Sequence, residues 1–323
     1  MYNEEQKQRF ISDMQFTDDM RVFVTRVFVS LQKYEEAWGA DVCTRSVEEL
    51  RPVINELAGL RSSAAHTKIN VIRKYFSWCK NNGIPDVTDA AFQLSPDNTD
   101  NIRSQLISGP LAMELFLSKI FRPISDHEVS ILFRCFYWFL FSGIRESDAI
   151  YVKKHDIDFQ SMLIHFNGDD YPIYKEAIDT IRLALELREF YYYHSLYTER
   201  KEITRMNSEY IMSASESILS LHYVKTYTNK KKRKAAEKGE ENIDLTFDHA
   251  FLSGIFYRKF ELERAIGAPF TYEDFLDVVE FVTRDSKYSE KAKTTPGRIT
   301  SMKNRMARHY LEDYNTWKRV FSV

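Results

Sequence analysis

The stretch from Arg61 to Lys80 contains five basic residues and no acidic residue. The five are Arg61, Lys68, Arg73, Lys74 and Lys80. Polar side chains gather where this stretch predicts the start of a helix, at Ser62, Ser63, His66 and Thr67. Free backbone N–H groups and hydroxyls at a helix start can bind phosphate. We interpret the segment as a helix laid along a DNA groove, and the alternative is an ordinary solvated helix face.

Two further windows are basic. Residues 225–238 hold seven basic residues against the single acid Glu237, and residues 291–308 hold six and no acid. The candidate phosphate contacts in these windows are Lys230, Lys231, Lys232, Arg298, Lys303 and Arg305. Because the whole chain has a net charge of −2, these windows imply segregated charge, which suits a protein that encircles DNA. A solvated helix end and a surface helix are the alternatives.

A third group of residues surrounds Arg145. An apolar helix ends in the segment Phe139-Leu-Phe-Ser-Gly-Ile-Arg-Glu-Ser-Asp148, so Arg145 directly follows a helix-breaking glycine turn. Short strands are expected at 157–159, 162–166 and 171–174, and a helix is expected from about 175 to 193.

This order of elements resembles the tyrosine recombinase (phage integrase) family, whose first arginine box reads Thr/Ser-Gly-Leu/Ile-Arg-x-Ser-Glu-Leu. The helix from Ser63 to Trp78, Ser-x-x-x-Thr-x-x-x-x-Ile-Arg-x-x-Phe-x-Trp, is similar to the family's core-binding domain. The resemblance implies metal-free phosphoryl transfer, in which a tyrosine attacks a DNA phosphodiester while two arginines, a lysine and histidine-type residues assist. It implies that Arg145 is the first of those arginines. The alternative is an arginine that bridges Glu146 or Asp148.

The rest of the family's catalytic set does not match. The hairpin lysine is replaced by Asn167-Gly-Asp-Asp-Tyr171, and no histidine is followed by arginine three residues on. The best context for that second box is Thr246-Phe-Asp-His249, a predicted capped start of an apolar helix, which has Leu252 at the arginine position. The segment His222-Tyr-Val-Lys225 is a weaker alternative. Losing one preorganised charged contact costs on the order of 10²–10³ in rate.

The nucleophile also lacks its usual setting. Tyr310 and Tyr314 are late tyrosines, but neither stands in a matching motif. We therefore expect Arg145 to be vestigial, with His249, Tyr310 and Tyr314 as the remaining catalytic candidates. The runner-up is a divergent active recombinase that takes its second arginine from elsewhere, such as Arg258 or Arg284.

The sequence predicts a mainly α fold with a small β-hairpin or sheet, in a two-domain tyrosine-recombinase-like architecture. Residues 1–100 are expected to form a helical core-binding domain, because helical spacing over 20–34, a capping box at Ser46 and Glu49, and the 62–80 helix follow one another. The polar stretch before Pro110 is the expected linker, 101–110. Residues 111–323 are expected to form the catalytic-like domain.

The amino-acid composition indicates what kind of protein this is. The chain has 323 residues, 44% hydrophobic and 14% aromatic, with few glycines and prolines, as is typical of a globular, mostly helical protein. The cysteines Cys43, Cys79 and Cys135 lack metal-ligand spacing and are expected to be reduced and buried. We expect no metal or cofactor, and a cytoplasmic protein of a bacterial cell, bound to its DNA.

The functional prediction is a sequence-specific double-stranded DNA-binding protein that has lost strand cleavage. Temperate phages carry repressors on this fold, so the resemblance implies a transcriptional repressor of a phage or mobile element. Alternatives are an active recombinase and a protein-interaction scaffold that no longer binds DNA. The tail Tyr314–Val323 suggests a homo-oligomer or a tail packed on its own domain. An antagonist protein or peptide is a further expected partner.

Overall fold

The computed structural model describes residues 1–95, 97–121, 129–193, 200–204, 208–214, 217–237, 239, 245–283 and 296–323, without the side chains of 58, 191–193, 200–204 and 296–298. The chain divides into two compact units. The first comprises Met1–Ile102 and Phe270–Ser322, and the second comprises Arg103–Pro269 and Val323. The boundary near 102 falls inside the expected linker, whereas segment 270–322 groups with the N-terminal residues rather than with the expected catalytic-like domain.

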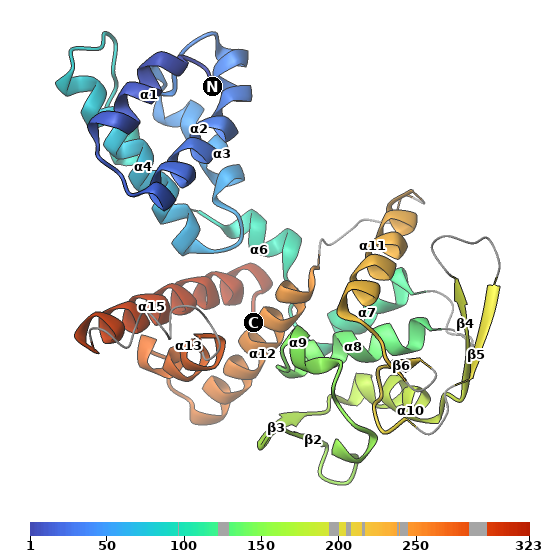
Figure 1. Ribbon diagram of the computed structural model, residues 1–323. Coiled ribbons are helices and arrows are strands. Elements are labelled where there is room, and N and C mark those ends of the chain that lie inside the picture. Colours follow the sequence, from blue (N-terminus) through green and yellow to red (C-terminus); the bar gives the residue numbers. More distant parts are fainter. Residues whose placement is uncertain are drawn as a thin grey trace. The chain divides into compact units, whose positions relative to one another are not determined.

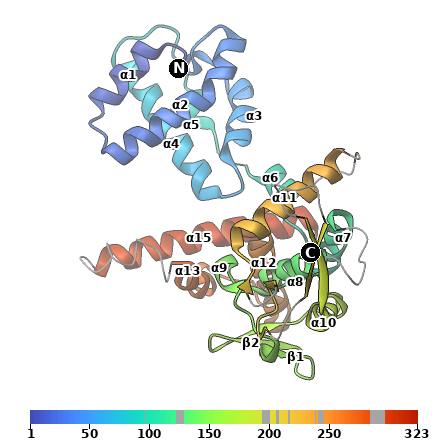
Figure 2. The ribbon, with the colours of Figure 1, turned by 45° about the vertical axis from the view of Figure 1, so that its right-hand side comes forward.

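The first unit is a helical bundle (Figure 1). Its N-terminal elements are α1 (Glu4–Asp13), α2 (Asp18–Trp38), η1 (Val42–Thr44), α3 (Val47–Ala58), α4 (Ser62–Asn81) and α5 (Ala90–Gln93). Helix α6 (Thr99–Gln105) follows, crosses the boundary between the units, and overlaps the expected linker 101–110. The C-terminal elements of this unit are η4 (Tyr272–Phe275), α13 (Leu276–Thr283) and α15 (Pro296–Phe321), of which α13 lies along α15 (Figure 2).

Two local features in this bundle follow from the sequence. The predicted capping box is confirmed, because the Ser46 hydroxyl accepts from the Glu49 N–H at 3.3 Å and the Glu49 carboxylate accepts from the Ser46 N–H at 2.9 Å. Lys7 and Glu35 form a fully buried ion pair at 2.5 Å. Glu35 also accepts from the Val42 N–H at 2.9 Å, so this pair ties α1 and α2 to the turn at η1.

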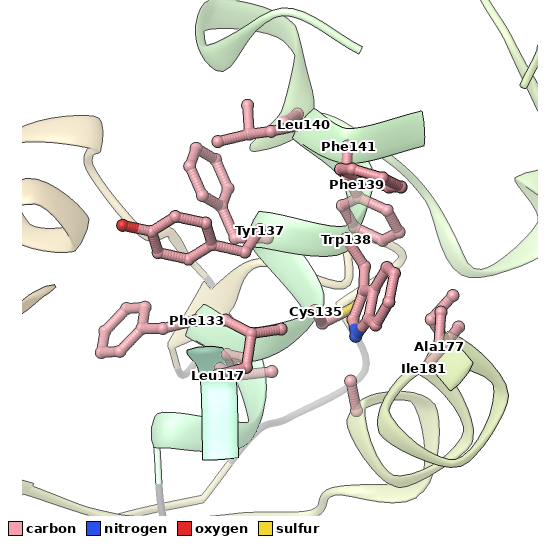
Figure 3. Packing of buried hydrophobic residues seen from close by; sticks show 14 of the residues in the cluster. Leu117, Phe133, Cys135, Tyr137, Trp138, Phe139, Leu140, Phe141, Ala177 and Ile181 are labelled. Carbon is pink, nitrogen blue, oxygen red and sulfur yellow. The ribbon is translucent and has the colours of Figure 1, made fainter. Parts of the chain in front are cut away.

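The second unit has an all-buried helix at its centre. Its helices are α7 (Pro110–Ile120), α8 (Ser130–Ser142), α9 (Glu146–Ala149), η2 (Lys154–Asp156), η3 (Lys175–Ala177), α10 (Ile178–Glu186), α11 (Leu221–Glu237) and α12 (Phe247–Ile266). Every residue of α8 is buried, and its aromatic side chains pack in all directions (Figure 3). Arg134 is the charged member of this helix, and it forms an ion pair with Glu114 of α7.

Among its described residues, the second unit also contains three small antiparallel sheets. Strands β1 (Ile157–Asp158), β2 (Leu163–Phe166) and β3 (Asp169–Pro172) form one sheet in that order. Strands β4 (Glu189–Tyr193) and β5 (Arg200–Thr204) form a second, and β6 (Ser213–Ala214) pairs with β7 (Ser217–Ile218). The prediction of a helix from 175 to 193 is therefore wrong for its last residues, because α10 ends at Glu186 and β4 begins at Glu189.

Candidate functional site

Helix α4 is amphipathic, and its two faces differ in kind. One face is apolar and buried, with Ile69, Ile72, Tyr75, Phe76 and Cys79 in the core of the bundle. The opposite face presents Thr67, Asn70, Lys74 and Asn81, all of them exposed. These positions are three, four and seven residues apart, which places them on one side of a helix. The sequence contains no acid from Gly59 to Pro85, so this face carries only neutral polar and basic groups.

Three of the five basic residues named from the sequence hold the bundle together. Lys68 donates to the Leu57 carbonyl, and burial lowers the pKa of its ammonium group. Arg73 donates to the carbonyls of Ala91 at 3.1 Å and Leu94 at 2.7 Å, which closes the end of α5. Lys80 forms an ion pair with Asp89 at 2.5 Å. Among the five, Lys74 is the exposed cation on the polar face.

The start of α4 is tied to α15. The Ser62 N–H donates to a carboxylate oxygen of Asp313 at 2.9 Å, and the Ser62 hydroxyl donates to the His309 carbonyl at 3.4 Å. Asn98 donates to the same Asp313 oxygen at 2.9 Å, and Arg61 lies 3.7 Å from the other. Burial raises the pKa of Asp313, whereas Arg61 and the Ser62 N–H oppose that rise.

At this helix start, Arg61 and Ser62 interact with α15, whereas Thr67 is exposed. Ser62 is buried and its N–H is taken by Asp313, so its predicted role as a phosphate ligand is replaced by a structural one. Arg61 lies over the ring of Tyr310, 4.1 Å from its centroid. Ser63 and His66 are half-buried, and the Thr67 hydroxyl donates to the Ser63 carbonyl at 2.8 Å.

A groove of about 560 Å³ follows the polar face of α4. Its walls include Met14, Met20, Thr67, Asn70, Arg73, Lys74, Ser77, Trp78 and Asn81. Asn70 and Asn81 are uncharged, so the count of charges along this helix did not indicate them. Their spacing relative to Thr67 and Lys74 carried the signal that these four residues share one helix face.

The Arg145 turn lies in the second unit and begins at Gly143. Gly143 has a φ of 105°, and a Cβ added there would overlap the guanidinium of Arg258 on α12. Arg145 is the N-cap residue of α9, and its Nε lies 3.4 Å from a carboxylate oxygen of Asp148. Next to it, Glu146 accepts from Lys225 at 2.8 Å. The arginine, the lysine and the acids of this turn thus interact with one another.

Helix α12 begins at the predicted place. Its N-cap Thr246 accepts from the His249 N–H at 3.2 Å, which confirms the capped start. His249 is half-buried, and its carbonyl accepts from the Ser253 hydroxyl at 2.7 Å. Leu252, at the position where the family has its second arginine, is buried.

The β2–β3 hairpin carries a charge pair in place of a lysine. Asn167 and Gly168 form its turn with φ values of 53° and 83°, as the Asn-Gly pair favours. His165 Nδ1 lies 2.7 Å from a carboxylate oxygen of Asp170, and this hydrogen bond raises the pKa of His165. Strand β3 begins at Asp169, two residues before the expected third strand.

The late tyrosines are packed inside the first unit. Tyr314 is fully buried and stacks on Trp317 with ring centroids 6.1 Å apart, and Tyr310 is also buried beneath Arg61. A nucleophile must reach a phosphodiester, so buried tyrosines do not fit that role in this arrangement. The alternative arginine Arg284 lies outside the described residues.

The other basic windows are partly used within the fold. On α11, Lys232 donates to the Leu245 carbonyl at 2.6 Å, Lys231 lies 5.4 Å from the Tyr227 ring centroid, and Lys230 is exposed. On α15, Lys303 donates to Glu280 at 2.9 Å and Arg305 is exposed. The side chain of Arg298 lies outside the described residues.

Comparison with known proteins gives two results. Residues 1–81 match the family model described as "MrpR, N-terminal core-binding domain". A crystal structure of a lambda integrase (75–356) dimer bound to a COC′ core site resembles the chain with 12% identity and a TM-score of 0.36, over 84% of this chain and 93% of the integrase. At that similarity no residue of the integrase can be matched to one of this chain. A search of the curated proteins finds no match.

These findings define the class of fold. Residues 1–81 are similar to a core-binding domain, and the chain is mainly helical with small antiparallel sheets, as the sequence predicted. Within the part of the chain that the structure describes, no helix is both long and apolar enough to cross a membrane.

Proposed function

We propose that this protein binds double-stranded DNA at specific sequences through the exposed face of α4, without cutting the DNA. We further propose that it regulates transcription, as a repressor of a phage or mobile element. The observation that carries the proposal is the acid-free polar face formed by Thr67, Asn70, Lys74 and Asn81.

The chemistry of this face suits a DNA groove. An asparagine side chain can donate to and accept from the edge of adenine in the major groove, and a lysine can bind a phosphate or guanine. An acid on this face would be repelled by the phosphates, and none is present. Lys68 and Arg73 stabilise the bundle that presents the face, because each donates to a backbone carbonyl of a neighbouring segment.

Binding without cleavage is supported by the state of the expected catalytic positions. The hairpin has His165 and Asp170 in place of a lysine, the second arginine position is the buried Leu252, and Tyr310 and Tyr314 are buried. A protein that occupies a DNA site and leaves it intact can block transcription by occupancy. Operators beside promoters are the expected targets.

One observation favours the second candidate, an active recombinase. The guanidinium of Arg258 lies against Gly143, two residues before Arg145, so two arginines approach the same turn. A phosphate bound there would receive two cations, as phosphoryl transfer requires. This candidate predicts that one tyrosine becomes covalently attached to DNA.

The proposal is tested by selecting genomic fragments with the purified full-length protein and measuring the salt dependence of their binding. We expect discrete sites near promoters, bound far more tightly than unrelated DNA of equal length. Affinity should fall as salt rises, because phosphate contacts release counterions. Equal binding of all fragments would contradict sequence specificity, and no binding would leave the scaffold alternative.

Two expected partners stay as proposals. Self-association through the tail is one, and within a single chain Tyr314 and Trp317 are buried while Val323 is 42% exposed. Sedimentation of the free protein at several concentrations tests it. An antagonist that releases the protein from DNA is the other.

A further inference from the structure

Three side chains with metal-binding atoms meet on the surface of the first unit. His66 comes from α4, and His309 and Glu312 come from adjacent turns of α15. Their ligand atoms all lie within 4.8 Å of one another. Among the described residues this is the one group of three or more such side chains close enough to hold an ion.

The distances suit a tetrahedral ion. His309 Nδ1 lies 3.1 Å from Glu312 Oε2, and His66 Nε2 lies 3.7 Å from the same oxygen. Zinc binds histidine nitrogen and carboxylate oxygen at about 2.0–2.2 Å, which places neighbouring ligand atoms about 3.3–3.5 Å apart at tetrahedral angles. The observed separations lie on either side of that value, so small side-chain rotations would bring the three atoms around one ion.

The ligand types select the class of metal. Two imidazoles and one carboxylate suit zinc and related divalent transition metals, whereas calcium and magnesium prefer oxygen ligands alone. Three protein ligands leave a fourth position for water. The side chains are 42%, 22% and 51% exposed for His66, His309 and Glu312, so an ion can enter from solvent.

The neighbouring charges do not oppose a cation. Arg61 is close to this end of α4, but it lies beside the carboxylate of Asp313 and over the ring of Tyr310. The ring centroids of His66 and His309 are 5.5 Å apart, so the two imidazoles are already in contact. Both helices are held in place by the Ser62 to Asp313 hydrogen bond one turn away.

We propose that His66, His309 and Glu312 form a binding site for a divalent transition metal ion of the zinc class, which links α4 to α15. The bound ion would hold the helix that carries the polar face against the C-terminal helix of the same unit. The sequence did not indicate this site, because His66 is far from His309 and Glu312 in the chain, and a single histidine with a glutamate three residues on does not by itself predict a metal site. The inference stands independently of DNA binding.

The test is a zinc titration of the full-length protein in competition with a chromophoric chelator. We expect one zinc ion per chain, and a rise in thermal stability that scales with free zinc. Replacing zinc by Co²⁺ should give the visible absorption of a tetrahedral site. Protons compete for imidazole nitrogens, so zinc binding should weaken in acid.

Variants separate this site from adventitious binding. His309→Ala and Glu312→Gln should each weaken zinc binding by more than about 100-fold, because even outer-shell changes cost 10–100-fold. The control is His155→Ala, since the His155 side chain is 69% exposed and lies in the second unit. Glu312→Gln keeps the side-chain volume, and its circular dichroism reports whether it folds. Unchanged zinc affinity in a folded Glu312→Gln and in His66→Ala, or no binding by the wild type, would overturn the proposal.

Discussion

The two regions that resemble a recombinase treat their charges in opposite ways. The exposed face of α4 has no acid. Two of the basic residues of this helix, Lys68 and Arg73, donate to backbone carbonyls of neighbouring segments. Around Arg145 three basic groups have an acid nearby: Arg145 has Asp148, Lys225 has Glu146, and His165 has Asp170. The exposed face of α4 therefore carries no acid, whereas the basic groups at the Arg145 turn lie beside acids. Under the proposed function, this difference makes α4 the expected DNA-binding surface.

The largest expected effect is a loss of stability in the helical bundle that contains α4. Glu35→Ala removes the nearest acid of the fully buried Lys7 and leaves Asp41 at 3.7 Å, so we expect a loss of about 3 kcal/mol in the free energy of unfolding. Urea unfolding of the full chain, followed by circular dichroism, measures it. The exposed Glu36→Ala is the matched control and should change stability by less than about 0.5 kcal/mol. Equal effects of the two variants would show that the buried pair does not anchor the bundle.

The next effect sharpens the account of the Arg145 turn. Gly143→Ala should cost about 1–2 kcal/mol for the left-handed backbone and about 1–3 kcal/mol for the overlap with Arg258. Combining it with Arg258→Ala should remove the steric overlap, so that the double variant loses only the free energy that the left-handed backbone at position 143 costs. The reference is the single variant Arg258→Ala, measured in the same thermal unfolding assay. If the double variant is only as stable as the sum of the two single-variant losses predicts, Arg258 does not occupy the space beside position 143.

A smaller effect tests the polar face itself. Asn70→Ala should lose about 1–3 kcal/mol of binding at the selected DNA site and less on unrelated DNA, because a base contact carries sequence information. Fluorescence anisotropy on both duplexes measures the difference. Lys80→Ala, on a residue that pairs with Asp89, is the control and should change neither affinity appreciably.

Lys74→Ala should weaken binding to all sequences alike. A lost phosphate contact reduces the slope of log affinity against log salt by about 1. The same anisotropy titration, repeated at several salt concentrations, gives the slope. An unchanged slope would mean that Lys74 does not reach a phosphate.

The smallest effect is a titration. The hydrogen bond to Asp170 raises the pKa of His165 above its ordinary value. A raised folded-state pKa contributes stability that is fully present below the unfolded-state pKa and is lost as pH rises through the folded-state pKa. Asp170→Asn should therefore bring the NMR titration of His165 to lower pH. A midpoint that does not move would show that the pair at 2.7 Å is absent in solution.

The local elements were the most predictable from the sequence. The capping box at Ser46, the helix start at Thr246 and the Asn167–Gly168 turn each depend on a few neighbouring residues, and each appeared where expected. The grouping of segment 270–322 with the N-terminal helices was not predictable. It depends on Asp313 bonding to Ser62 and Asn98, and such contacts between distant residues leave no local pattern.

The candidate site was predicted only in part. The sequence predicted the helix and showed that it contains no acidic residue. It did not distinguish a basic side chain that faces solvent from one that donates to the end of a neighbouring helix. Arg73 and Lys68 do the latter, and only their burial and acceptors reveal it. The neutral residues Asn70 and Asn81 carried no charge signal.

The most direct test of binding without cleavage uses the selected DNA site with a nick placed at successive positions. A nicked duplex traps a phosphotyrosyl intermediate, because the released end cannot rejoin. We expect the full-length protein to shift every nicked duplex in a native gel and to leave none attached in denaturing detergent. A detergent-stable adduct that disappears when one tyrosine is changed to phenylalanine would contradict the account and establish an active recombinase.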